Sequence, residues 1–172
     1  MNSVPRRGST LSQPSSNNFE IRRAQSKPEL TATAALFRAY AASLNIDLSP
    51  QGFAEELAAL PGPYAPPDGA ILLAKQGDHV LGCIALKRLA PGIAEIKRLY
   101  VRPQARRTGV AKALVAAMLQ EAASLGYDEV KLDTLSQMTT AIALYRGFGF
   151  DDIPPYGSHP YAGLVTLGKK LS

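Results

Sequence analysis

The longest helical pattern in the chain lies over residues 109–125. Apolar side chains recur there every three or four residues and form one stripe along a helix face. Gly126 follows directly, and glycine commonly ends helices. The same spacing predicts helices over residues 28–44 and 51–60, and a short one over 139–148. The stripe of the longest helix consists of Val110, Leu114, Met118, Ala122 and Leu125.

Runs of apolar residues separated by turn residues predict about seven strands. Gly77 and Asp78 form a tight turn between two of them, and Pro91 with Gly92 separates the next pair. Because the 109–125 helix connects two consecutive strands, these flanking strands are expected to be parallel. The sequence therefore predicts an α/β fold with a mixed sheet and four helices. The expected strands are 19–24, 69–76, 79–89, 93–101, 129–134, 150–153 and 163–171.

The first 18 residues differ in composition from the rest of the chain. They are rich in Ser, Asn and Pro, so we expect a disordered tail followed by one domain over 19–172. The tail has no apolar segment typical of a secretory signal, and no stretch resembles a membrane-spanning helix. A single cysteine, Cys83, excludes an internal disulfide and a cysteine-cluster metal site. We expect a cytoplasmic protein that needs no metal, with Cys83 as a buried packing residue.

Positive charge is concentrated just before the 109–125 helix. The net charge is +5, and residues 87–112 contain eight basic side chains and one acid, Glu95. The first N–H groups of a helix have no partner within the helix and attract anions together with the helix dipole. Gly109 lets a ligand approach the backbone, so the segment is either a phosphate or pyrophosphate site or an electropositive solvated loop. The cations expected to add mobile charge are Arg102, Arg106, Arg107 and Lys112.

The sequence RRTGVA, from Arg106 to Ala111, is similar to the [QR]-x-x-G-x-[GA] signature of the GNAT superfamily of acyl-CoA-dependent N-acetyltransferases. It follows the strand EIKRLYV and opens the longest helix. The segment AIALYRGFGF, residues 141–150, is similar to the family's LYxxxGF segment. The resemblance covers residues 19–171 and implies a GNAT-like fold that moves an acetyl group from acetyl-CoA to a primary amine. Ala111 stands where Gly is commoner, and Thr139 where many members carry Asn.

The resemblance assigns cofactor binding to this loop and to the end of the preceding strand. Backbone N–H groups of residues 107–111 would bind the CoA pyrophosphate. Residues 99–101 would pair with the pantetheine arm as if it were another strand. The implied cofactor-binding residues are Leu99, Tyr100, Val101, Arg106, Arg107, Thr108, Gly109, Val110, Ala111, Lys112 and Thr139.

The resemblance also implies three catalytic residues. The N–H of Leu99 would stabilise the oxyanion, Tyr145 would protonate the departing thiolate, and Glu95 would match the strand carboxylate that some members use as general base. Two alternatives remain open. Tyr145 lies on an apolar helix face and could be a core residue. Glu95 could form a salt bridge with a neighbouring Lys or Arg, while a water chain replaces the base.

The acceptor side of the site is less defined. The segment PPYGSHPYAG is either a rigid surface loop or an acceptor-binding wall that uses Tyr156, His159 and Tyr161. The helix with Glu55 and Glu56 either forms the opposite wall or presents a solvated acidic face. The expected partners are acetyl-CoA and a small-molecule or peptide amine, with no nucleic acid and no membrane; a homodimer is left open. A non-catalytic acyl-CoA-binding module is the alternative function.

Overall fold

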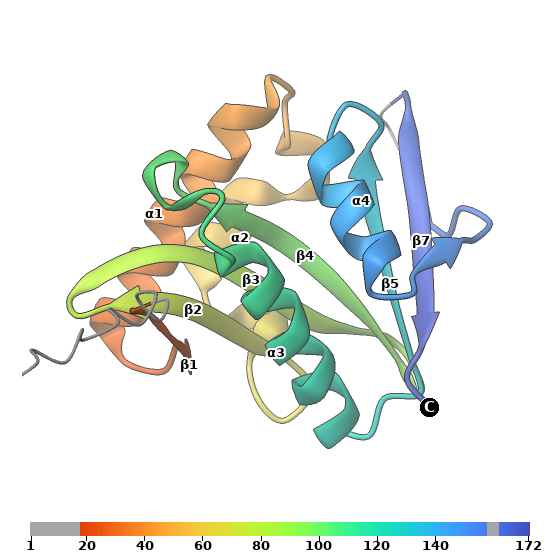
Figure 1. Cartoon of the computed structure of the whole chain (residues 1–172), viewed down its shortest axis with the longest axis horizontal. Coiled ribbons are helices and arrows are strands. Elements are labelled where there is room, and N and C mark those ends of the chain that lie inside the picture. The colour runs from red at the N-terminus through yellow and green to blue at the C-terminus, as the bar shows by residue number, and fades with distance from the viewer. Residues whose placement is uncertain (1–17, 158–161) are drawn as a thin grey trace, which may run out of the picture.

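The structure is a computed structural model that describes residues 18–157 and 162–172. In these ranges, seven strands form one mixed sheet in the order β1-β2-β3-β4-β5-β7-β6, and four α-helices pack on it (Figure 1). The predicted mixed α/β fold is therefore confirmed, whereas residues 1–17 of the predicted tail lie outside the description. The strands are β1 (Glu20–Arg23), β2 (Ala70–Gln76), β3 (His79–Ala90), β4 (Ile93–Val101), β5 (Glu129–Leu135), β6 (Asp151–Asp152) and β7 (Leu164–Lys170). The helices are α1 (Lys27–Leu44), α2 (Phe53–Ala59), α3 (Val110–Ser124) and α4 (Thr139–Gly147).

The sheet combines antiparallel neighbours with one parallel pair. Each neighbouring pair among β1, β2, β3 and β4 is antiparallel, and β7 is antiparallel to both β5 and β6. Strands β4 and β5, which flank α3 in the sequence, are parallel. A helical crossover allows this orientation, whereas a tight turn does not, so the prediction for the flanking strands is confirmed.

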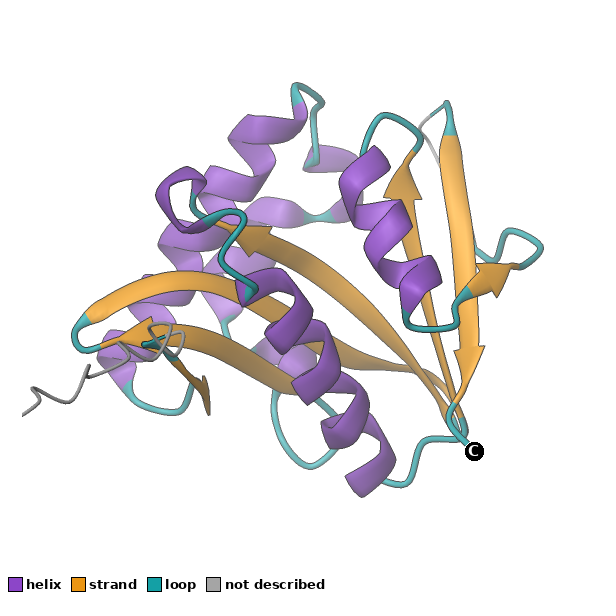
Figure 2. Ribbon diagram, in the orientation of Figure 1, coloured by secondary structure: helices purple, strands orange, loops and turns teal. Residues whose placement is uncertain are grey.

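Helices cover both faces of the sheet (Figure 2). Successive strand residues point to opposite faces, and β2 follows this rule closely. Leu72 packs in a core cluster with residues of α3, such as Leu114 and Met118. Leu73 packs in a second cluster with Leu36 and Phe37 of α1. Two apolar layers therefore enclose the sheet, one beneath α3 and α4 and the other beneath α1.

The sheet opens between β4 and β5. Their ladder contains three residue pairs, which join Ile93–Glu95 to Glu129–Lys131. Beyond this point the two strands diverge (Figure 2), while β4 stays paired with β3 as far as Val101 and β5 stays paired with β7. An edge of each strand therefore faces the gap, where an extended ligand could hydrogen-bond to the backbone.

Candidate active site

Helix α3 begins at the gap without a side-chain cap. Gly109 is its N-cap residue and has a φ of 86°, and Arg107 just before it has a φ of 63°. Glycine adopts this left-handed conformation readily, whereas other residues are strained there. With no capping side chain at Gly109, the first backbone N–H groups of α3 are available to a ligand. This geometry suits an anion close to Gly109, Val110 and Ala111.

The cations around this loop are arranged differently from the expectation. Arg102 Nε donates to the carbonyl oxygen of Val80 at 2.9 Å, and Arg106 Nε donates to that of Val101 at 3.1 Å. The Arg106 guanidinium also lies 5.8 Å from the centre of the Tyr100 ring. The expectation of freely mobile charge is wrong for these two arginines, because backbone carbonyls hold both side chains. Arg107, Thr108 and Lys112 are exposed.

A bulge interrupts β4 beside the gap. Lys97 pairs with Ala85 and Tyr100 pairs with Cys83, so Arg98 and Leu99 together stand opposite a single residue of β3. Arg98 has a φ of 64°, which is uncommon for a residue with a side chain. The Cys83 thiol donates to the carbonyl oxygen of Arg98 at 3.3 Å and is fully buried, as expected. Bulges often redirect backbone groups next to active sites, and this one includes Leu99.

The Arg98 side chain is buried, and sequence reasoning did not identify it as a site residue. Its guanidinium donates to Glu56 Oε2 at 3.0 Å and to the Gln51 side chain at 3.3 Å, and lies 5.3 Å from the Phe53 ring centre. Glu56 also accepts a hydrogen bond from Tyr64 at 2.5 Å. The solvated-face interpretation is therefore wrong for Glu56. The available signal was an arginine in the middle of an otherwise buried strand.

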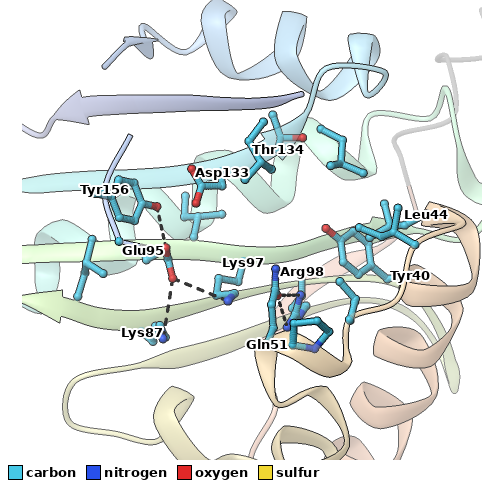
Figure 3. Close-up of a pocket in the computed structure, with 18 residues that line it drawn as sticks. Tyr40, Leu44, Gln51, Lys87, Glu95, Lys97, Arg98, Asp133, Thr134 and Tyr156 are labelled. Carbon is cyan, nitrogen blue, oxygen red and sulfur yellow. Dashed lines mark hydrogen bonds and ion pairs between the residues drawn. The ribbon is translucent and has the colours of Figure 1, made fainter. Parts of the chain in front are cut away.

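A cavity of about 330 Å³ lies where the strands diverge, on the sheet face that carries α1 and α2. Tyr40 of α1 and Arg98 line one part of it (Figure 3). Glu95 lines another part, and Asp133 and Thr134 of β5 contribute from the other side of the gap. The α3 N-terminus belongs to the opposite face, so the gap connects the uncapped helix start on one face with a polar cavity on the other.

Glu95 lies on the cavity wall and has three polar neighbours (Figure 3). The Tyr156 hydroxyl donates to its Oε2 at 2.7 Å, and Lys87 and Lys97 place their ammonium nitrogens 3.9 and 4.0 Å from its Oε1. The salt bridges considered for Glu95 are therefore present, and the carboxylate still reaches the cavity. Tyr156 lines the cavity, as the acceptor-wall hypothesis expected, whereas His159 lies outside the described residues.

Tyr161, the third residue of that hypothetical wall, also lies outside the described residues. The remaining expected cofactor contact, Thr139, is the first residue of α4 and is exposed. Helix α4 likewise starts without a side-chain cap, because Met138 occupies its N-cap position.

Tyr145 of α4 was considered either as a core residue or as the proton donor, and its surroundings agree with parts of both interpretations. Its ring is buried in the core beneath α3 and α4, 5.4 Å from the ring centre of Phe150 in an edge-to-face contact. Burial raises the pKa of Tyr145, and the Tyr40 phenol adds to this increase. Tyr40 belongs to the opposite face of the sheet and lines the cavity. Tyr145 and Tyr40 are therefore electrostatic neighbours across the gap.

The comparisons with known proteins agree with this geometry. A family model described as "Acetyltransferase (GNAT) family" matches residues 34–150. An uncharacterized N-acetyltransferase of Schizosaccharomyces pombe is 34% identical over 159 residues, which is 91% of this chain and 97% of that protein. The chain therefore belongs to the GNAT family of acetyltransferases. It is an acyltransferase.

Solved structures share the fold at lower identity. An acetyltransferase from Streptococcus agalactiae superposes with a TM-score of 0.74 at 20% identity, over 89% of this chain and 98% of that chain. The PaiA N-acetyltransferase from Thermoplasma acidophilum, solved in complex with coenzyme A, superposes with a TM-score of 0.69 at 21% identity, over 88% and 98% of the chains. Both have the fold of this chain.

The described residues lack two other kinds of feature. Within residues 18–157 and 162–172, no three His, Cys, Asp or Glu side chains are grouped so that they could hold a metal ion. In the same part of the chain, none of the helices has the length and apolar character needed to cross a membrane.

Proposed function

We propose that the protein moves an acetyl group from acetyl-CoA to a primary amine by direct attack of the amine on the thioester. The observation that carries the proposal is the gap between β4 and β5, which has an uncapped helix start on one face and a polar cavity on the other. Membership of the GNAT family and the coenzyme A complex of a protein with the same fold support this donor.

The donor would bind through backbone groups of the first face. The N–H groups of residues 107–111 would hold the pyrophosphate at the start of α3, where the helix dipole adds favourable potential. The edge of β4 from Leu99 to Val101 would pair with the pantetheine arm. The fit is supported by the left-handed Gly109, whose missing side chain leaves room for a phosphate near the backbone.

The reaction would take place inside the gap. The amine nitrogen attacks the carbonyl carbon of the thioester, the carbon–sulfur bond breaks, and CoA leaves as a thiolate. The N–H of Leu99, a residue of the bulge, would stabilise the negative charge on the carbonyl oxygen. Tyr145 would give its hydroxyl proton to the thiolate, since a tyrosine phenol is protonated at neutral pH. Glu95 would accept the amine proton, directly or through water.

A thiol-release assay with acetyl-CoA and a panel of primary amines tests the proposal. We expect release of free CoA thiol that depends on both the amine and the protein. An acetylated amine identified by mass spectrometry would establish the transfer. Tight binding of acetyl-CoA without amine-dependent thiol release from any member of the panel would instead favour a non-catalytic acyl-CoA-binding module.

A further inference from the structure

Two lysines next to Glu95 have no part in the chemistry proposed above. Lys87 lies directly across from Glu95 in the β3–β4 ladder, and Lys97 lies two residues further along β4. Side chains at these positions emerge on the same face of the sheet, so all three enter the cavity together. The backbone ladder fixes their spacing. A group bound between the two lysines would therefore meet two cations whose backbone positions are set by the sheet.

The ammonium groups of these lysines retain hydrogen-bonding capacity. Their distances to Glu95, 3.9 and 4.0 Å, satisfy an ion pair but exceed the normal length of a hydrogen bond. The Lys87 and Lys97 side chains are 31% and 22% exposed, so a ligand in the cavity can reach them. Each ammonium has three N–H donors, which can turn toward an anion in the cavity.

The charge around the lysines favours an added anion. Glu95 is shared between Lys87 and Lys97, and its other oxygen accepts the Tyr156 hydrogen bond. Arg98, the next cation along β4, is paired with Glu56 outside this group. Burial and the nearby Arg98 lower the pKa of Lys97, and an anion bound beside its ammonium group would oppose this effect.

The carboxylate on the opposite wall, Asp133, is hydrogen-bonded to β7. It accepts a hydrogen bond from the Thr166 hydroxyl at 2.8 Å. Figure 3 shows Glu95, Lys87 and Tyr156 at one end of the cavity and Tyr40 and Leu44 at the other. The two ends of the cavity thus present different chemical groups.

Resting on the acetyl transfer proposed above, we infer that the acceptor is a primary amine that also carries a carboxylate. Lys87 and Lys97 bind the carboxylate at the Glu95 end of the cavity. The amine then lies toward Tyr40 and the bulge at Leu99, where the thioester would enter, and its proton would reach Glu95 through water in the cavity. Amino acids and molecules built like them have this combination of groups.

The test compares 4-aminobutyrate with its amide, 4-aminobutyramide, as acetyl acceptors. Three methylenes separate the two ends, so the amines are similar in basicity and the carboxylate is the main difference. We expect the acid to have a KM about tenfold to a hundredfold lower than the amide, the range typical of a hydrogen bond to a charged group. Lys87→Met should remove this preference, so that the ratio of the two KM values approaches one; taking the ratio cancels any effect of the substitution on Glu95. Lys170→Met, at an exposed lysine of β7, is the matched control and should change neither value.

Binding of the product analogues separates this inference from the proposed transfer. Calorimetry with 4-acetamidobutyrate and 4-acetamidobutyramide, in the presence of CoA, needs no turnover. Tighter binding of the acid that depends on Lys87 supports the carboxylate site even if no amine is acetylated. Equal binding of acid and amide overturns the inference, and so does acetylation that prefers a diamine such as cadaverine. Amine acetylation without any carboxylate preference overturns it while leaving the transfer itself intact.

Discussion

Tyr156 donates its hydroxyl hydrogen to Glu95 across 61 positions of sequence and thereby fixes the segment before β7 to the wall of the cavity. Burial and the Glu95 charge raise the pKa of Tyr156, so the phenol keeps this hydrogen throughout the neutral and mildly alkaline range. The contact connects the two strands that diverge, because Glu95 is on β4 and the segment of Tyr156 leads into the partner of β5.

Tyr156→Phe removes this hydrogen bond and keeps the ring. We expect the free energy of unfolding to fall by about 1–2 kcal/mol, and the KM of the acceptor to rise because Glu95 is less well held. Tyr127→Phe is the matched control, since the Tyr127 hydroxyl donates to the Asp68 carbonyl at 2.5 Å, away from the cavity. Urea unfolding and initial rates measure the two effects. An acceptor KM that responds equally to both substitutions would contradict a role for Tyr156 in the site.

Tyr145→Phe tests the proposed proton donor. The ring would still pack against Phe150, so we expect a melting temperature and a CoA affinity close to those of the wild type. Loss of the hydroxyl should lower kcat by about 10²-fold, the lower end of the range for a general acid, since a thiolate leaves readily. Initial rates and melting curves measured on the same preparation distinguish a proton donor from a core residue. Unchanged turnover with a lower melting temperature would make Tyr145 a core residue only.

Gly109→Ala tests the pyrophosphate loop. The φ of 86° strains any residue with a side chain by about 1–2 kcal/mol, so a loss of stability alone would prove nothing. Gly126→Ala provides the control, because Gly126 has a φ of 89° beyond the other end of α3, with open space where a Cβ would stand. We expect both variants to lose similar stability and only Gly109→Ala to lose affinity for CoA in calorimetry. Normal CoA affinity in Gly109→Ala would place the phosphates elsewhere.

Glu56→Gln tests the ion pair behind the bulge. The Arg98 side chain is 3% exposed, so loss of its partner leaves a charge with little access to water. We expect the free energy of unfolding to fall by about 3 kcal/mol. The exposed neighbour Glu55 is the control, and Glu55→Gln should cost little. The double variant Glu56→Gln with Arg98→Met should recover part of the loss, since it removes the unpaired charge. A double variant that is less stable than Glu56→Gln would show that Arg98 contributes mainly through its other contacts.

The lowered pKa of Lys97 predicts that the stability of the protein depends on pH. Burial is the largest cause of the lowered pKa, followed by the positive charge of Arg98, and Lys87 acts in the same direction. The negative charges of Glu95 and Glu56 act in the opposite direction. The unfolded chain therefore holds this proton to a higher pH than the folded chain, and stability rises with pH through that window. The gain is complete above the ordinary lysine pKa of about 10.4 and disappears as the pH falls through the lowered value. In urea unfolding at several pH values, wild type should gain stability relative to Lys97→Met as the pH rises. A constant difference would contradict the lowered pKa.

Much of the fold could be predicted from local sequence patterns. Patterns such as the apolar stripe of residues 109–125 and the turn at Gly92 predicted the order of helices and strands, because hydrophobic periodicity and turn residues are local signals. The loop proposed to bind the pyrophosphate could also be picked out, since its glycine, its cations and the helix start are adjacent in the chain.

The acceptor side could not be predicted in the same way. Glu56 and Arg98 are 42 positions apart, and their pairing depends on how α2 docks against β4. The bulge at Arg98 arises from the β3–β4 register, which the apolar pattern of β4 does not specify. Arg102 was expected to be mobile because the sequence gives no indication that the Val80 carbonyl lies within its reach.

The three-pair ladder between β4 and β5 also has a mechanical consequence. Strands β1–β4 form one half of the sheet and strands β5–β7 the other. Backbone pairing joins these two halves only at the short β4–β5 ladder, so they can move relative to each other about that ladder. A ligand whose extended arm pairs with the β4 edge would brace the open end. Amide hydrogen exchange along residues 96–101 and 132–135 should therefore slow together when CoA binds. The two halves of the sheet should then unfold as a single cooperative unit.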